Sequence, residues 1–273
     1  MVAIVTKLPY AVGRLTLRWA LLLAALLPIV GLGIFAYSRQ YTEGEVITGM
    51  RDLGPMGGAP WGIYVVFTMG VGVAGISVAA LVRVFHMHTL RPLVRMAEVL
   101  SIVALLLGLA AIIADLGQPV RGMINLMRYG RPQSPFFGTM SLSIAYLMAA
   151  TLYLYLDGRR DAALCARVSG RLQWFYRIWA AGYQDTPEQR ETHDKAAFWL
   201  AVAILILVVV YHATLGFVFG LQVAQPGWFT PLLALWHLTL NAVSGIGGVL
   251  ILVAATVRLT LGARDQLPTK IFG

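Results

Sequence analysis

Six segments of the chain are long, apolar and almost free of charge, since each holds at most one charged residue. A helix needs about 20 apolar residues to cross the hydrocarbon core of a bilayer, which is about 30 Å thick. We therefore predict six transmembrane helices. They span about Leu17–Tyr37, Trp61–Arg83, Met96–Ala114, Phe136–Leu156, Ala196–Gly220 and Trp228–Val257.

The composition indicates that the whole chain belongs in a membrane. Hydrophobic residues make up 59% of the 273 residues and charged residues 12%, values far from those of soluble domains. We predict an all-α integral membrane protein, with residues 1–273 forming a single membrane domain and a bundle of about six transmembrane helices. The first span is too long for the apolar core of a cleavable signal peptide, so we expect it to remain as an anchor.

The basic residues are distributed unevenly between the two sides of this bundle. The chain holds 21 Lys and Arg residues against 12 Asp and Glu residues, a formal net charge of +9. If both termini lie in the cytoplasm, sixteen of the 21 basic residues fall inside, as expected from the positive-inside rule. We predict this N-in/C-in orientation, and the basic charge then requires no nucleic-acid partner. The basic residues left outside are Arg39, Arg51, Arg121, Arg128 and Arg131.

The cysteine content limits the cofactors that the chain can hold. Cys165 is the single cysteine, which excludes a disulfide within the chain, a cysteine-ligated cluster and a thiolate zinc site. A redox cofactor would have to be ligated by histidine, bound without a covalent link, or carried by another subunit, and no metal site is predicted.

The polar segment 157–195 mixes both charge signs with aromatic residues, and we predict an amphipathic stretch along the cytoplasmic face, with a solvated loop as the alternative.

Inserting an ionisable residue at mid-depth of a span costs about 2.5–3.5 kcal/mol of free energy. Each such residue in or beside a span therefore needs a structural or functional explanation. Glu98 lies near the inner end of the third span and Asp115 at its outer end, about 25 Å apart along a helix. The two carboxylates cannot share one site. We expect Glu98 at the inner interface with Arg95 as its cationic partner, and a role in a proton path is the alternative.

His212 and His237 are predicted at matching depths, about 12–13 Å below the outer boundary, on helices joined by a short loop. Three interpretations remain open. The imidazoles can be axial ligands of a b-type haem, for which Ala213 and Gly216 leave room. They can hydrogen-bond a quinone head group, or they can make a polar contact between helices.

Asp115 is unfavourable at a helix C-terminus, so a counter-ion is expected, and Arg121 is the nearest basic residue in the sequence. The pair either orders the loop or leaves Asp115 as a carboxylate that takes protons from a quinol.

Aromatic residues near the outer side, among them Trp61 and Tyr64, fit an interfacial belt. The small residues of "NAVSGIGG", 241–248, allow close helix packing.

Four stretches, in this order and spacing, resemble the membrane subunits of the polysulfide reductase, or NrfD-like, family. They are "PWGIYVVFTMGVGVAGIS" (Pro60–Ser77), "DLGQPVRG" (Asp115–Gly122), "YGRPQSPFFGTM" (Tyr129–Met140), and "VVVYHATLGFVFG" continuing to "PGWFTPLLALWHLTLNAVSG" (Val208–Gly245). Three departures stand out. Gln118 replaces a common arginine, His237 stands where a phenylalanine is expected, and the chain has six predicted spans where family members commonly have eight or more.

The resemblance implies a quinone-reactive subunit of a respiratory complex in the inner membrane of a prokaryote. The alternatives are a haem b-binding membrane anchor, with His212 and His237 as ligands, and a purely structural anchor or a transporter. Subunits of this family usually hold no redox cofactor of their own; they bind menaquinone or ubiquinone near the outer face and exchange electrons with an iron–sulfur subunit there. Molybdopterin or multihaem cytochrome c subunits are further partners. Asp115 and His212 are then the catalytic candidates, and Glu98 remains the candidate for a proton path. The expected quinone-binding residues are Trp61, Tyr64, Asp115, Arg121, Tyr129, His212 and His237.

Overall fold

The computed structural model describes residues 17–44, 47, 67–87, 90–115, 118–167, 172–221, 223 and 226–259. Helices are the only regular elements in these ranges. They are α2 (Leu17–Glu43), α4 (Thr68–Val84), α5 (Arg91–Asp115), α6 (Pro119–Tyr129), α7 (Pro135–Ala166), α8 (Gln173–Ala180), α9 (Pro187–Gly220) and α10 (Leu232–Leu259). Within the described ranges, α2, α5, α7, α9 and α10 are long and apolar enough to cross a membrane, and α4 is a shorter apolar helix. The prediction of an all-α integral membrane protein is confirmed.

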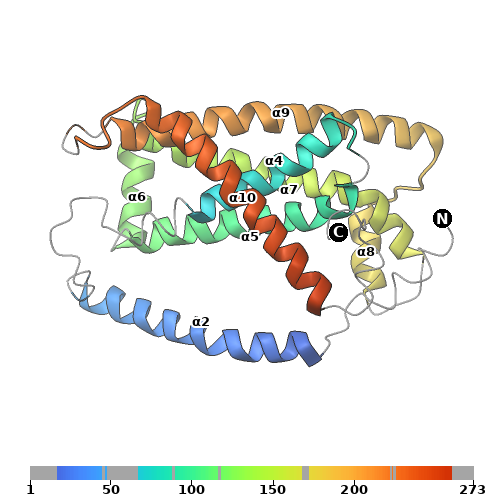
Figure 1. The fold of residues 1–273 in the computed structure, drawn as a ribbon, viewed down its shortest axis with the longest axis horizontal. Helices are drawn as coiled ribbons and strands as arrows, with labels where there is room; N and C mark the ends of the chain where they lie inside the picture. Colours follow the sequence, from blue (N-terminus) through green and yellow to red (C-terminus); the bar gives the residue numbers. More distant parts are fainter. Residues whose placement is uncertain are drawn as a thin grey trace.

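Five helices form the bundle, with α4 at its centre (Figure 1). Helix α4 packs against α5, α9 and α10, and α7 packs against α5 and α9. Eleven of the seventeen residues of α4 are buried, and small residues at Gly70, Gly72 and Gly75 let its neighbours approach closely. The largest cluster of buried hydrophobic residues therefore forms around α4, between α5, α7 and α9.

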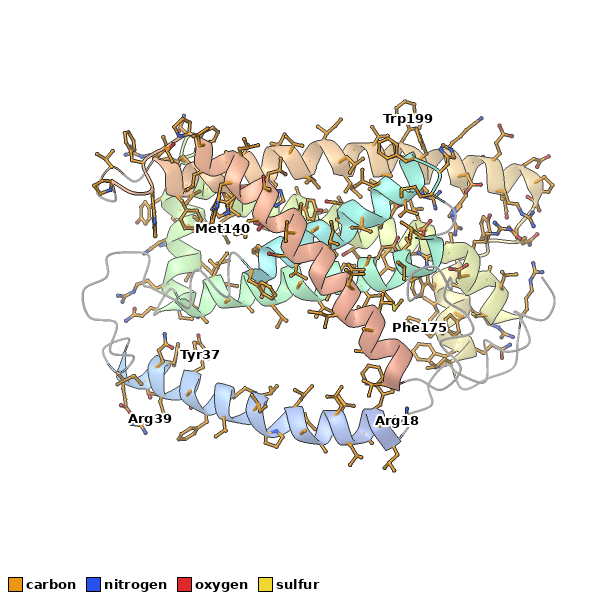
Figure 2. All side chains as sticks on the ribbon, viewed as in Figure 1. Arg18, Tyr37, Arg39, Met140, Phe175 and Trp199 are labelled. Carbon is orange, nitrogen blue, oxygen red and sulfur yellow. The ribbon has the colours of Figure 1, made fainter. Side chains whose placement is uncertain are left out.

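Two short helices lie crosswise at opposite ends of the bundle (Figure 1). Helix α6 lies at one end and α8 at the other, and we call these the α6 end and the α8 end. Helix α2 runs beside the bundle and buries none of its side chains. Apolar side chains cover the outside of the long helices, and Trp199 points away from α9 (Figure 2). Exposed apolar residues on this scale suit contact with lipid.

The segment 157–195 differs from the single amphipathic stretch that we predicted. Helix α7 continues through it to Ala166, and α9 begins at Pro187, nine residues before the predicted span. The early start of α9 has a local cause, since Thr186 caps the helix by accepting a hydrogen bond from the backbone N–H of Gln189 at 3.3 Å. Only α8 remains as a short amphipathic helix, with Trp174 and Ile178 exposed.

The predicted loop 117–135 also contains a helix. Helix α6 begins with Pro119, a residue suited to the first turn, and ends before Gly130, whose N–H bonds the carbonyl of Leu126 at 3.0 Å. Its side chains are exposed or only partly buried, so α6 places a small amphipathic surface at this end of the bundle.

Candidate functional site

The structure divides the predicted quinone-binding residues into separate groups. Trp61 and Tyr64 lie outside the described residues, and Asp115 is described only as the last residue of α5, without its side chain. Arg121 and Tyr129 are exposed on α6, at the α6 end. The two histidines, His212 on α9 and His237 on α10, are each only 2% exposed.

A close crossing of α9 and α10 brings the two histidines together. A Cβ atom on Gly216 would collide with the backbone of Ala234, so these two residues mark the contact between the helices. His212 lies one turn before Gly216, and His237 lies one turn after Ala234. Because the helices run in opposite directions, both imidazoles lie on the same side of the crossing. The two histidines that were predicted at matching depths are therefore neighbours in the structure.

The hydrogen bonds of His212 fix which of its nitrogen atoms carries the proton. Its Nδ1 lies 2.7 Å from the backbone carbonyl of Val208, which can only accept, so Nδ1 is the donor. In the neutral imidazole, Nε2 is then an acceptor. Among the described residues, this buried Nε2 has no hydrogen-bond partner, and neither has the buried Nδ1 of His237.

Aromatic rings surround the pair. Phe219 stacks on His237 with ring centroids 5.3 Å apart, and Trp236 meets the same imidazole edge-on at 5.3 Å. Trp228 packs edge-on against Phe219 at 5.8 Å, so these rings cover His237 toward the α6 end. Tyr211 lies edge-on to His212 at 5.6 Å. The result is a largely apolar environment with a few unpartnered polar atoms, which is the usual character of a small-molecule site.

Asn241 is a further buried polar residue beside the histidines. It lies one turn beyond His237 on α10 and is 1% exposed, and both its Nδ2 and its Oδ1 lack partners among the described residues. Gly70 of α4 faces it, because a Cβ there would collide with the Asn241 amide. The sequence prediction treated this stretch only as close packing and missed Asn241. The usable signal was an amide four residues from a histidine in an uncharged span.

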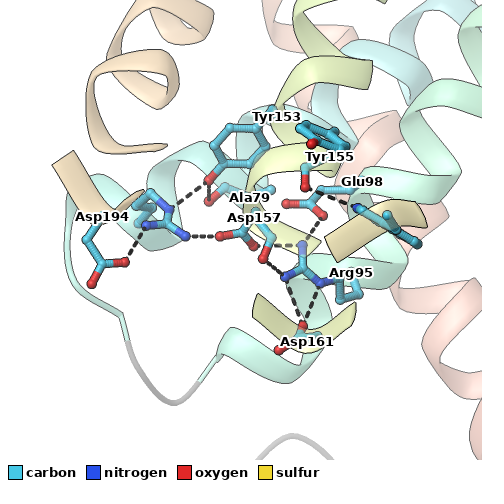
Figure 3. A network of polar contacts seen from close by, with 10 residues as sticks. Ala79, Arg95, Glu98, Tyr153, Tyr155, Asp157, Asp161 and Asp194 are labelled. Carbon is cyan, nitrogen blue, oxygen red and sulfur yellow. Dashed lines mark hydrogen bonds and ion pairs between the residues drawn. The ribbon is translucent and has the colours of Figure 1, made fainter. Parts of the chain in front are cut away.

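A second cluster of polar residues lies near the α8 end and joins four helices (Figure 3). Arg95 of α5 is its centre. The Arg95 guanidinium lies 2.8 Å from Glu98, 2.8 Å from the Asp157 carboxylate and 3.0 Å from that of Asp161. The predicted Arg95–Glu98 pair is therefore present. The Glu98 side chain is fully buried between the helices, and its Oε1 has no partner in the described part of the chain.

Arg83 of α4 extends this ionic network to α9. Its guanidinium pairs with Asp157, lies 3.7 Å from Asp194, and donates to the hydroxyl of Tyr153 at 3.3 Å. Together with Arg95 and their neighbours, these residues line a cavity of about 410 Å³. Sequence reasoning had assigned Arg83, Asp157 and Asp194 to loops and ends of spans, so it did not anticipate that they would meet.

Hydroxyl groups lie in the core between the histidines and the ionic network. Ser143 donates to the Tyr211 hydroxyl at 3.2 Å, and the Tyr211 ring stacks on Tyr146 at 5.8 Å. Tyr146 and Tyr153 are two turns apart on α7, and Tyr153 contacts the network. All of these side chains are almost fully buried, so hydroxyl groups are spaced along the core, and we call them the hydroxyl column.

The described residues offer more to a small organic ligand than to a metal. No group of three or more His, Cys, Asp or Glu residues in the described ranges is arranged to hold a metal ion. At the α6 end, Arg121 and Gln118 line an open cavity of about 420 Å³ together with Tyr41 of α2. The histidines and Asn241 provide hydrogen-bonding groups farther into the bundle.

The sequence of the chain is similar to those of known proteins. The profile of the family described as polysulphide reductase, NrfD matches residues 54–267. Over 257 residues the chain is 28% identical to a protein of Halobacterium salinarum that is named as a membrane subunit of dimethyl sulfoxide reductase; the match covers 93% of this chain and 55% of the relative. Over 230 residues it is 24% identical to a selenate reductase subunit of Mesobacillus selenatarsenatis, covering 81% of this chain and 53% of that relative. The chain thus spans about half the length of the curated relatives it matches.

Proposed function

Because the chain belongs to the polysulphide reductase, NrfD family, we propose that it is the quinone-reactive membrane subunit of a multi-subunit respiratory oxidoreductase. The observation that carries the proposal is the pair of buried, unpartnered imidazole nitrogens on His212 and His237. A buried polar atom without a partner is unfavourable, and a ligand with two polar oxygens on an apolar ring would satisfy both. A quinol head group has this chemistry, because its hydroxyl groups can donate hydrogen bonds to an acceptor such as Nε2 of His212.

The partners in this proposal follow from the relatives. Those proteins are named as subunits of a dimethyl sulfoxide reductase and of a selenate reductase, and each name implies further subunits. We propose an iron–sulfur subunit docked at the α6 end, taken as the outer face, and a molybdopterin or multihaem cytochrome c subunit beyond it. The ligand is menaquinone or ubiquinone, and the location is the inner membrane of a prokaryote.

Oxidation of a quinol releases two electrons and two protons, and the chain must accept the protons. Electrons pass to the iron–sulfur partner in this proposal, and Asp115, at the α6 end of α5, is the proposed proton acceptor. The Nε2 atom of His212 is a suitable relay because it has a free lone pair. Glu98 belongs to a proton path from the α8 end, supported by its burial and by the hydroxyl column.

The haem-anchor alternative has less support. Iron between two axial imidazoles requires a porphyrin ring to fit between the ligating helices. Gly216 and Ala234 hold α9 and α10 in backbone contact one turn away from both histidines. Helices this close leave little space for a porphyrin between His212 and His237.

The proposal is tested on the intact complex by quinol-driven turnover. Asp115→Asn and His212→Gln should each lower kcat by about a hundredfold or more, the usual range for loss of a proton-transfer group. Glu191→Gln is the matched control, since Glu191 forms an exposed pair with Lys195 at the far end of α9 and should leave turnover unchanged. Unchanged turnover in both Asp115→Asn and His212→Gln, or a haem b absorption spectrum in the purified chain, would overturn the proposal.

A further inference from the structure

We infer that Asn241 is a third ligand-binding residue of the His212–His237 site, with its amide hydrogen-bonded to an oxygen of a quinone-type ligand. The inference rests on the proposed function, because it takes the same ligand. It adds a residue on a helix face that the sequence indicated only for close packing. The unused hydrogen-bonding capacity of Asn241, its position and the chemistry of its amide carry the inference.

The first observation is the complete lack of partners for the Asn241 amide. A side-chain amide offers two donor hydrogens and an acceptor oxygen, and in the described part of the chain none of them is used. The side chain is 1% exposed, so neither lipid head groups nor bulk water can satisfy it. Buried amides are almost always hydrogen-bonded in folded proteins, which indicates that something other than the described protein atoms meets this one.

The second observation is the position of Asn241 relative to the histidines. His237 and Asn241 are four residues apart on α10, so their side chains project from the same face, one turn apart. Both of them and His212 hold unpartnered buried atoms, which makes four such atoms on three neighbouring side chains. Glu98 holds the one other atom of this kind among the described residues, and it belongs to the ionic network at the α8 end.

The third observation concerns Gly70, which faces Asn241 across the α4–α10 contact. A Cβ atom at position 70 would collide with the Asn241 amide, so the space that the amide occupies depends on a glycine in α4. Gly245, one turn farther along α10, is likewise in contact with Ala74 of α4. Helix α4 therefore packs closely against this part of α10, and any added atom at position 70 would displace the Asn241 amide.

The chemistry of the amide complements that of His212. His212 has its proton on Nδ1, so in the neutral state Nε2 can accept a hydrogen bond from a quinol hydroxyl but cannot donate one to a quinone carbonyl. Asn241 can donate through Nδ2 or accept through Oδ1. A site that holds the ligand before and after oxidation needs such a group, because the ligand oxygen changes from donor to acceptor.

The experiment measures equilibrium binding of two probes, menadione and decylubiquinone, to the intact complex in nanodiscs by quenching of tryptophan fluorescence. Asn241→Leu should raise Kd at least tenfold, equivalent to about 1.4 kcal/mol. Asn241→Ser, which keeps a donor and an acceptor, should remain within about threefold of wild type. Gly70→Ala should also raise Kd, because it displaces the amide. In turnover, Asn241→Leu should raise KM far more than it lowers kcat.

Thr239→Val is the matched control on the same helix, since Thr239 is exposed and its hydroxyl bonds the Leu235 carbonyl. It should bind both probes as wild type does. If His212→Gln weakens binding and Asn241→Leu does not, the inference about Asn241 is overturned while the proposed function stands. If the wild-type complex binds neither probe, the proposed function itself fails. Should Asn241→Leu not assemble, an unchanged Kd in Gly70→Ala overturns the inference.

Discussion

Arg95 carries one positive charge and contacts three carboxylates, those of Glu98, Asp157 and Asp161. Glu98 is fully buried, so this carboxylate depends on Arg95 for its compensation. Breaking a buried ion pair by removing one partner is more harmful than removing both, because the remaining charge is left in a medium of low dielectric constant. We therefore expect that replacing Arg95 alone destabilises the protein more than replacing Arg95 and Glu98 together.

Arg95→Ala should lower the free energy of unfolding by about 3–5 kcal/mol, and adding Glu98→Gln should recover part of that loss. The measurement is thermal unfolding of the purified protein in detergent, analysed as a double-mutant cycle. Lys195→Ala is the control, since the Lys195–Glu191 pair is about 70% exposed and should contribute less than about 1 kcal/mol. Equal effects of Arg95→Ala and Lys195→Ala would contradict the role given to Arg95.

The sequence contained part of this residue-level picture. Counting helix rise from the ends of the spans predicted that His212 and His237 lie at the same depth, and both are buried on the same side of the α9–α10 crossing. The same counting could not find the ionic network, because Arg83 and Asp157 come from different helices, α4 and α7, and meet only in the folded bundle. Asn241 was missed because one amide hardly changes the mean hydropathy of a long apolar span.

Helices α9 and α10 position the histidines through one close contact, and that contact predicts how the elements respond to a single methyl group. Gly216→Ala should force the helices apart at Ala234 and lower the free energy of unfolding by about 1–3 kcal/mol. Gly247→Ala on α10 is the matched control, because nothing lies within 4 Å of its added Cβ, and it should gain up to about 1 kcal/mol in helix propensity.

Both variants are compared by thermal unfolding in detergent and by binding of menadione. Gly216→Ala should also weaken binding, since it separates His212 from His237, whereas Gly247→Ala should not. If the two variants unfold at the same temperature and bind equally well, α9 and α10 are not held together at this contact. The comparison isolates packing, because both substitutions add the same methyl group to a helical glycine.

Hydropathy predicted the existence of these elements better than their ends. It measures only the part of a helix that lies in lipid, whereas α7 and α9 continue into polar sequence at the α8 end. The start of α9 was nevertheless present in the sequence as Thr186, Pro187 and Gln189, a capping pattern that needs no apolar residues. Helix α6 was missed for the same reason, since its eleven residues are too few and too polar to form a span.

At the scale of the whole molecule, the two crosswise helices mark the two ends of the bundle and so define its two sides (Figure 1). The distribution of basic residues predicts that the α6 end lies outside and the α8 end inside. This orientation underlies the proposed docking of an iron–sulfur subunit at the α6 end. It also sets the direction in which protons would travel between Asp115 and the ionic network around Arg95.

The orientation is testable because the chain has a single cysteine, Cys165, which can be replaced by serine. In that background, Arg131→Cys places a thiol on an exposed position at the α6 end, and Glu188→Cys places one at the α8 end. A membrane-impermeant maleimide added to intact spheroplasts should label position 131 and not position 188. Inside-out vesicles should give the reverse, and permeabilised cells should label both. Labelling of position 188 in intact spheroplasts would reverse the orientation and move the proposed partner to the other end of the bundle.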